Sequence, residues 1–488
     1  MSVTDPVCGC TRTMTLPDGT TSVITHTFPK ALEHHYPLPP LEATGIPVYR
    51  GDFDLNAFRW RGVISIDLEP RPTLVAHGVR EMNFGKEKGG TVGVREPAKW
   101  VDQEQLTITA KSVPPPAKTT RAPQRPKAPA VVGTLADNLA RIDVGDPDHL
   151  DYITFFVING WFGRDGFNTC HDGQERQGRI DIVLDGWQLR VEPRGDIAPD
   201  QLRKDMQATG KNTVTHVGRI RRDDGTTFRA VEALDLLKIV ETMGGFALGR
   251  VISTALPVGY RAGKATWTRW QCDRAVDRPI GATPFLDPAV SAAQMAELFR
   301  AGLATSKDTL RWEVFENALG YHYAAEHDAT VNIKVLLPVS ALQLISYAHL
   351  VEELPSGHPD HKTASQWNDN YNFSTTEQLR TVLRVAGIDM SAPPHLVNLA
   401  KVQSDITEPK KLPTPDALDC VVRLRNKVAH PKQKQANRWS TEEWAETGFA
   451  ATTMFNLAML WWLNYDERYL GKTFEYRGSG DSQFVPWH

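Results

Sequence analysis

The chain has 488 residues, of which 41% are hydrophobic and 23% are charged, and its formal net charge is −3. This length exceeds one ordinary domain and predicts two to three domains. The composition is that of a globular protein, which argues against a globally disordered chain and against a membrane protein. The near-neutral net charge gives no support for nucleic-acid binding by the chain as a whole.

The N-terminus and the cysteines predict a cytoplasmic protein. Residues 1–6 lack the basic region and apolar core of a secretory signal. The longest apolar stretch near the C-terminus, residues 449–463, is too short and too polar for a bilayer span, so no membrane partner is expected. The cysteines suit a reducing compartment better than a disulfide framework, because they are scattered and odd in number: Cys8, Cys10, Cys170, Cys272 and Cys420.

The first 285 residues are predicted to be rich in antiparallel β-structure. Residues 1–45 show no sustained period and are interpreted as an N-terminal arm. Residues 46–285 are interpreted as a β-rich module with one helix at 230–243, and Asp185-Gly186 supplies a hairpin turn. Short β-branched or alternating segments predict its strands at 63–68, 73–76, 106–109, 152–158, 180–184, 187–191 and 214–220, and near Val251 and Trp267.

A proline-rich segment, residues 112–131, interrupts this module. It contains six prolines interleaved with lysine and arginine. Proline fixes φ and removes a backbone donor, so the segment is predicted to be an extended, solvated linker.

Residues 286–488 are predicted to form an all-α domain. Asp287 followed by Pro288 has the pattern of a helix start. Helices are predicted at 331–353, with a disturbance at Pro338, and at 375–386, 415–430 and 442–465, and aromatic and aliphatic residues recur at helical spacing over 312–323. The predicted fold class is therefore α+β, with an antiparallel β-rich N-terminal and middle region followed by a helical bundle.

The helix predicted at 415–430 carries the residues with chemical potential. Thr414 is expected as its N-cap with Pro415 at the first helical position, and Pro431 is expected to end it next to His430. Asn426 and His430 are four residues apart and share a side of the helix, and Arg425 lies one step round.

Arg425 and His430 together suit phosphodiester chemistry. RNA carries its own nucleophile, the 2′-hydroxyl, so a histidine that transfers protons and an arginine that binds phosphate are sufficient for cleavage without a metal or cofactor. Asn426 is expected to orient them. Residues 401–438 hold nine Lys or Arg against four Asp or Glu, and Lys427, Lys432 and Lys434 are expected to hold the RNA backbone.

The segment Arg425-Asn426-Lys427-Val428-Ala429-His430 resembles the Arg-polar-x3-His motif of the HEPN superfamily. The spacing alone is weak, because Arg71 with His77 and Arg164 with His171 have similar spacing in β or loop contexts. The resemblance implies a bundle of four or five helices, metal-independent RNA cleavage, and a homodimer that brings two motifs into one cleft. More broadly, the chain is similar to bacterial proteins that couple a β-rich module to a C-terminal HEPN domain, including ApeA-like anti-phage proteins.

Two functional interpretations remain open. The first is an endoribonuclease that acts in phage defence or as a toxin-like effector, with the β-rich module binding an unidentified protein or phage trigger. The second is a non-catalytic HEPN fold that binds RNA or a protein partner. Gln343 keeps the second open, because such proteins often carry glutamate in this Ala-Leu-Glu-like position and this chain reads Ala341-Leu342-Gln343.

Competing sites have plainer explanations. The histidines and acids at 349–361 do not fit a known metal-ligand spacing, nor do Cys8 and Cys10 with the histidines at 34 and 35. Thr215-His216 on a strand is interpreted as a hydrogen-bonded structural pair. The Gly-rich residues 85–90 lack the phosphate-loop spacing.

Overall fold

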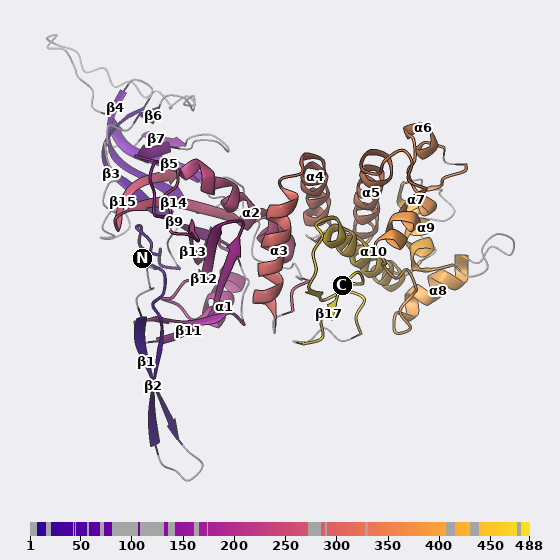
Figure 1. Cartoon of the computed structure of the whole chain (residues 1–488), viewed down its shortest axis with the longest axis horizontal. Coiled ribbons are helices and arrows are strands. Elements are labelled where there is room, and N and C mark those ends of the chain that lie inside the picture. The colour runs from indigo at the N-terminus through magenta and orange to yellow at the C-terminus, as the bar shows by residue number, and fades with distance from the viewer. Residues whose placement is uncertain are drawn as a thin grey trace. The chain divides into compact units, whose positions relative to one another are not determined.

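A computed structural model describes most of the chain, and it divides into two compact units (Figure 1). The β unit comprises Met1–Glu241 and Val251–Ile280, and the helical unit comprises Thr242–Arg250 and Gly281–His488. The described residues are 7–15, 21–41, 43, 45–55, 58–68, 73–80, 106–107, 131–134, 142–160, 165–172, 174–271, 285–287, 290–326, 330–369, 371–406, 415–429, 439–475 and 480–488.

The β unit is built on an eight-stranded antiparallel sheet, as the sequence predicts. The predicted hairpin is confirmed: Leu184 pairs with Trp187, and Asp185 and Gly186 both have positive φ, which is the geometry of a two-residue hairpin turn. In spatial order the strands are β10 (Phe167–His171), β11 (Gln174–Leu184), β12 (Trp187–Pro193), β13 (Val214–Arg222), β9 (Tyr152–Ile158), β14 (Ser253–Arg261), β15 (Lys264–Trp270) and β8 (Ile142–Gly145).

A second antiparallel sheet and two helices complete most of this unit. Residues 112–130 of the proline-rich segment lie outside the described residues, and its last residue, Val131, begins strand β7 (Val131–Thr134). Helix α1 (Pro199–Thr209) was not predicted, and α2 (Ala230–Leu248) begins at the predicted residue and extends further. The second sheet has the order β6 (Leu106–Thr107), β3 (Gly45–Leu55), β4 (Phe58–Asp67), β5 (Thr73–Arg80) and β7 (Val131–Thr134).

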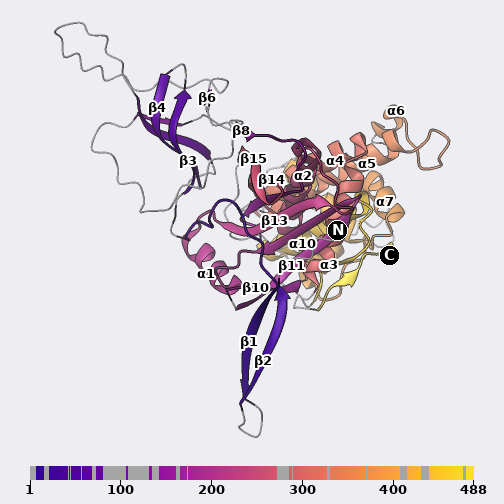
Figure 2. The ribbon, with the colours of Figure 1, turned by 60° about the vertical axis from the view of Figure 1, so that its left-hand side comes forward.

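The N-terminal arm contains a β-hairpin and a disulfide, and both differ from the sequence-based expectation. Strands β1 (Val7–Thr15) and β2 (Thr21–Pro29) pair in antiparallel register (Figures 1 and 2). Cys8 is joined to Cys170 by a disulfide, and the backbone N–H of Ala31 donates to the carbonyl of Cys170 at 2.8 Å. The expectation of reduced thiols is therefore wrong for this pair, whose 162-residue separation gave no local signal.

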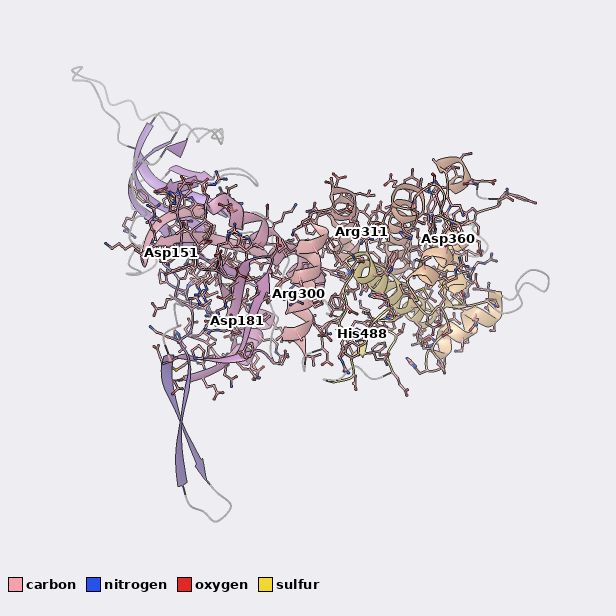
Figure 3. All side chains as sticks on the ribbon, viewed as in Figure 1. Asp151, Asp181, Arg300, Arg311, Asp360 and His488 are labelled. Carbon is pink, nitrogen blue, oxygen red and sulfur yellow. A yellow bond between two sulfur atoms is a disulfide. The ribbon has the colours of Figure 1, made fainter. Side chains whose placement is uncertain are left out.

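Strands β11 and β12 carry two cross-strand ion pairs. Asp181, labelled in Figure 3, faces Arg190 and accepts from its Nε. Arg179 and Glu192 form a second pair at 2.5 Å, with side chains 1% and 2% exposed. The Glu192 carboxylate also accepts from the backbone N–H of Leu32, so this pair fastens the segment that follows β2.

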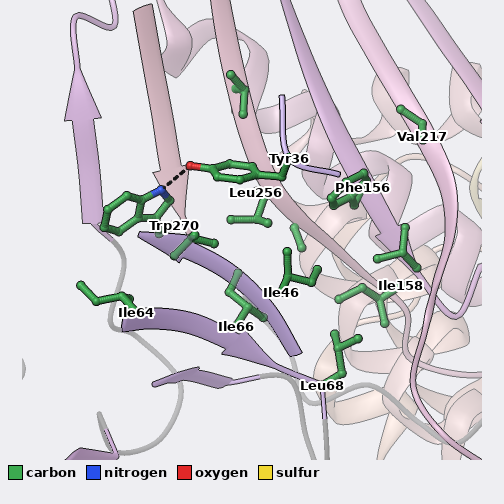
Figure 4. Packing of buried hydrophobic residues seen from close by; sticks show 14 of the residues in the cluster. Tyr36, Ile46, Ile64, Ile66, Leu68, Phe156, Ile158, Val217, Leu256 and Trp270 are labelled. Carbon is green, nitrogen blue, oxygen red and sulfur yellow. Dashed lines mark hydrogen bonds between the residues drawn. The ribbon is translucent and has the colours of Figure 1, made fainter. Parts of the chain in front are cut away.

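The core of the β unit lies between the two sheets (Figure 4). Ile64 and Ile66 of β4 pack against Phe156 and Ile158 of β9 in one apolar cluster. These side chains are fully or almost fully buried, so each contributes roughly 1.5–3 kcal/mol to folding. At its edge the indole Nε1 of Trp270 donates to the hydroxyl of Tyr36 at 2.7 Å, which satisfies a buried donor.

The helical unit confirms a predominantly helical C-terminal region and corrects its details (Figure 1). Helix α8 was not predicted, and α5 continues through Pro338 and changes to a π-helix at Ala348. Its elements are α3 (Ser291–Thr305), α4 (Thr309–Glu326), α5 (Ile333–Tyr347), η2 (Ala348–Glu353), α6 (Ala364–Trp367), α7 (Thr375–Val385), α8 (Val397–Ile406), α9 (Ala417–Ala429), α10 (Thr441–Trp462), β16 (Arg468–Tyr469) and β17 (Gln483–Phe484).

Asp287 is not the N-cap of a helix, contrary to the prediction from Asp287-Pro288. Helix α3 has Val290 at its N-cap position instead. The fully buried Asp287 carboxylate accepts from the N–H of Gly480 at 2.9 Å and from the hydroxyl of Ser482 at 2.6 Å. A buried carboxylate needs several donors, and the C-terminal segment supplies them.

One helical segment is long and apolar enough to cross a membrane by length and composition. It is Ile333–Glu353, with a mean hydropathy of 1.4. More than half of it, 56%, is buried inside the protein. Val335, Leu342 and Ile345 are at most 1% exposed, so this stretch packs as the core helix of the bundle.

His322 of α4 gives the helical unit an expected dependence on pH. Burial lowers its pKa, and Glu326 and Lys472, which form an ion pair at 2.5 Å beside it, act in opposite directions. Because the folded-state pKa lies below the unfolded value, the folded state favours the neutral ring. Stability is then complete above the unfolded pKa of about 6.5 and is lost as the pH falls below it.

We therefore expect the helical unit to lose up to about 1.4 kcal/mol of unfolding free energy between pH 7.5 and 5.5 through this residue. The loss is measured by urea titrations in which the hydrogen exchange of the α4 and α10 amides is monitored. His322→Gln is the control, because glutamine does not titrate. An identical pH dependence in both proteins would contradict the assignment to His322.

Candidate functional site

Helix α9 positions the predicted motif, and its start differs from the prediction. Thr414 lies outside the described residues, and Pro415 and Asp416 precede the helix. The N–H of Asp419 donates to Asp416 Oδ1 at 2.9 Å, and the N–H of Asp416 donates to Asp419 Oδ2 at 3.0 Å. This reciprocal arrangement makes Asp416 the N-cap, two residues after the expected one.

The apolar face of α9 fixes its rotation. Leu418, Val421 and Leu424 are 0% exposed, and the helix packs against α5, α7, α8 and α10. Arg425, Asn426 and Lys427 are all half-buried and follow this stripe. The C-terminal turn of α9 therefore holds polar groups at the boundary between core and solvent.

At the opposite end of α9, Arg380 of α7 is an arginine whose positive charge is paired with carboxylates. Its guanidinium contacts Asp416 at 2.9 Å, Asp419 at 3.2 Å and Glu377 at 2.9 Å. Burial opposes its charge, but the carboxylates of Asp416 and Asp419 prevail and raise its pKa. Its positive charge is fully compensated within the protein.

Arg425 is held by amide oxygens and not by carboxylates. Its Nη1 donates to Asn426 Oδ1 at 3.0 Å, and its Nη2 donates to Gln343 Oε1 of α5 at 3.0 Å. Its Nε is buried without a hydrogen-bond partner in the described part of the chain. Within that part, no carboxylate lies at ion-pair distance from the guanidinium.

Burial of the guanidinium lowers the pKa of Arg425. An arginine nevertheless keeps its proton at neutral pH, since its pKa is above about 12 in proteins. Among the residues that the structure describes, Arg425 is therefore a partly desolvated positive charge without a counter-ion. Such a group favours an external anion, and its planar donors match the oxygens of a phosphate.

Gln343 is the centre of a hydrogen-bonded chain that extends from Arg425. Its Nε2 donates to Gln378 Oε1 of α7 at 3.3 Å. Gln378 is 2% exposed, and its Nε2 donates to the carbonyls of Trp367 at 3.0 Å and Phe373 at 3.2 Å. Sequence reasoning singled out Gln343 by resemblance and missed Gln378, which carries no local signal.

The structure brings some predicted site residues together and leaves others undescribed. Arg425 and Asn426 are in direct contact, and Lys427 follows them on the same turn. His430, Lys432 and Lys434 lie outside the described residues, so their expected roles stay predictions.

Other candidate groups have structural explanations. Cys420 of α9 is buried, and burial raises the pKa of its thiol to about 12, which makes it a poor nucleophile. His216 is 2% exposed and its Nδ1 lies 3.0 Å from Thr215 Oγ1, in keeping with a structural pair. His349 pairs with Glu353 at 2.6 Å. No group of three or more potential metal ligands occurs among the residues that are described.

Two cavities lie away from Arg425. The larger, about 690 Å³, is in the helical unit and is lined by residues that include Asp389, Thr453 and Tyr469. The smaller, about 290 Å³, is in the β unit next to Thr215 and His216. Arg425 lines neither of these two cavities.

Two segments of the chain are similar to described domain types. Residues 145–281 match the family model of the YopA central domain, and residues 308–480 match that of the YopA C-terminal domain. The first segment lies in the β unit apart from residues 242–250 and the last residue, and the second lies in the helical unit.

A curated relative is described as prophage-derived. The chain is 21% identical over 334 residues to the SPbeta prophage-derived uncharacterized protein YopA of Bacillus subtilis (strain 168), which covers 68% of this chain and 71% of the relative. No solved structure gives a significant match.

Proposed function

We propose that this chain is a metal-independent endoribonuclease whose site is built on the C-terminal turn of α9. The observation that supports this most is the setting of Arg425. Its partly buried guanidinium donates to two amide oxygens, and no carboxylate of the described residues pairs with it. A positive charge held in this way is ready to bind a phosphodiester. Its place in an Arg-polar-x3-His motif, which resembles that of HEPN ribonucleases, supports RNA as the substrate.

In the proposed reaction the 2′-hydroxyl of RNA attacks the adjacent phosphorus. A base removes its proton, the O2′–P bond forms, the P–O5′ bond breaks, and an acid protonates the leaving O5′. Arg425 stabilises charge on the non-bridging oxygens, His430 transfers a proton, and Asn426 orients the guanidinium. Each chain supplies one His430, so a homodimer would provide both the base and the acid.

We place this activity in the cytoplasm, as a phage-defence or toxin-like effector. The prophage origin printed in the name of the Bacillus relative supports an association with phage. The β unit would then bind the trigger, a protein or phage component. Lys427, with Lys432 and Lys434, would hold the RNA backbone.

A second candidate is a non-catalytic RNA- or protein-binding domain. Gln343 favours it, because a neutral amide contacts Arg425 where HEPN proteins often carry glutamate. The same observation suits an anion-binding site in either case, since a carboxylate would compete with phosphate for the guanidinium.

The test is incubation of the full chain with single-stranded RNA and with DNA of the same sequence in excess chelator. We expect cleavage of RNA alone, with 2′,3′-cyclic phosphate ends. His430→Ala should lower the rate at least about 100-fold, and His395→Ala, an exposed histidine elsewhere in the helical unit, should not. Equal cleavage of DNA, or loss of cleavage in chelator, would overturn the mechanism. Tight RNA binding without cleavage would favour the second candidate.

A further inference from the structure

We define an aromatic cluster as the last residue of α5, Tyr347, together with three residues between η2 and α7, namely Trp367, Tyr371 and Phe373. The rings of Tyr347 and Trp367 meet edge to face at 5.3 Å, and those of Trp367 and Phe373 at 6.0 Å. The side chains of Tyr347 and Phe373 are half-buried, but that of Tyr371 is 95% exposed. Tyr371 therefore adds little to the packing of the folded chain.

The aromatic cluster is joined to the Arg425 site through two glutamine side chains. Gln378 donates to the carbonyls of Trp367 and Phe373, and accepts from Gln343, which in turn accepts from Arg425. Tyr347 lies four residues after Gln343 on α5, so the two share one helix face about 6 Å apart along its axis. Gln343 thus links the Arg425 site to Tyr347 along α5, and to Trp367 and Phe373 through Gln378.

Charged groups of both signs lie near the aromatic cluster. The ammonium of Lys362 lies 5.6 Å from the centre of the Phe373 ring and provides a positive group on one side. Asp369 caps the turn that carries Tyr371, accepting from its N–H at 3.2 Å, and Asp360, labelled in Figure 3, pairs with Arg384 at 3.5 Å. A polyanion that contacts these rings is therefore expected to approach Lys362 and to be repelled by Asp369.

We propose that the aromatic cluster is a base-stacking platform that makes the Arg425 site selective for single-stranded RNA. Tyr371, with the accessible part of Trp367, stacks one or two unpaired bases, while Arg425 binds a nearby phosphate. Exposed aromatic rings beside basic groups are the usual means of binding unpaired nucleotides. Bases within a duplex are already stacked and do not reach such rings. This inference rests on the proposed function and deepens it.

The test uses the full chain and a fluorescein-labelled 2′-O-methyl RNA oligonucleotide, which cannot be cleaved because it lacks the nucleophile. Binding is measured by anisotropy for the single strand and for its blunt duplex. We expect the wild type to prefer the single strand. Tyr371→Ala should raise its Kd about 5- to 30-fold with little change for the duplex, and Tyr371→Phe should retain most of the affinity.

Tyr321→Ala is the matched control, since Tyr321 is an exposed tyrosine of α4 that lies outside the aromatic cluster. An unchanged Kd in Tyr371→Ala, in a protein that still cleaves RNA, would overturn the platform and leave the proposed function standing. If the wild type neither binds nor cleaves RNA, the proposed function fails, and the platform fails with it. A Kd raised equally by Tyr321→Ala would also overturn the platform.

Discussion

Arg425→Met is expected to lower the kcat of RNA cleavage by about 100- to 1000-fold, the usual result of removing one donor that stabilises charge on a reacting group. Methionine keeps an apolar stem and removes the guanidinium. The charge is partly buried and lacks a carboxylate partner among the described residues, so its removal should not destabilise the helical unit. Activity and stability should therefore separate in this variant.

The measurement pairs single-turnover cleavage with urea unfolding of the same preparation. Arg423→Met is the control, because Arg423 is an exposed arginine two residues earlier on the same helix. It should retain activity close to that of the wild type. Equal losses of activity and of unfolding free energy in Arg425→Met would mean that Arg425 is a structural residue.

Glu192→Ala is expected to destabilise the β unit by about 3–5 kcal/mol, since it leaves Arg179 buried at 1% exposure without its counter-ion. The same substitution removes the acceptor for the Leu32 N–H. Hydrogen exchange of β11 and β12 amides in increasing urea reports the free energy of unfolding of this sheet. Both proteins are compared without reductant, so that the Cys8–Cys170 disulfide is intact in each.

Two controls bracket this result. Glu192→Gln keeps the shape and one acceptor but not the charge, and we expect an intermediate loss. Asp143→Ala breaks the ion pair with Arg269, in which the aspartate is 43% exposed, so it should cost less than about 1 kcal/mol. If Glu192→Ala and Asp143→Ala had the same small effect, burial would not determine the strength of these pairs.

Elements with strong short-range patterns were predictable from the sequence. The hairpin of β11 and β12 has apolar alternation on both strands and a turn at Asp185-Gly186, and it forms as predicted. Strand β9 matches its predicted bounds, Tyr152–Ile158. The β1–β2 hairpin was missed because its segments, VCGCTRTMT and TSVITHTFP, lack regular alternation of apolar and polar residues.

The candidate site was predictable in part. Arg425 and Asn426 are neighbours on one helix, so a local pattern found them. Their partner Gln343 is 82 residues away from Arg425, and Gln378 is 35 residues away from Gln343. Such contacts depend on how helices pack, and single-residue patterns do not encode this. The start of α9 was misplaced because Thr414-Pro415 is a general helix-start pattern, whereas the Asp416–Asp419 hydrogen bonds appear only in three dimensions.

The contact between Asp287 and residues 480–482 has a consequence for the order of events during synthesis. The backbone N–H of Leu470 also donates to the carbonyl of Phe285, at 2.8 Å. Residues 285–287 of the helical unit are therefore held by residues 470–482. Until those residues leave the ribosome, Asp287 lacks its donors and the bundle lacks its closing segment. A nascent chain would therefore be unable to assemble the proposed RNA site before residues 480–482 are made, and the proposed cleavage would be absent until then.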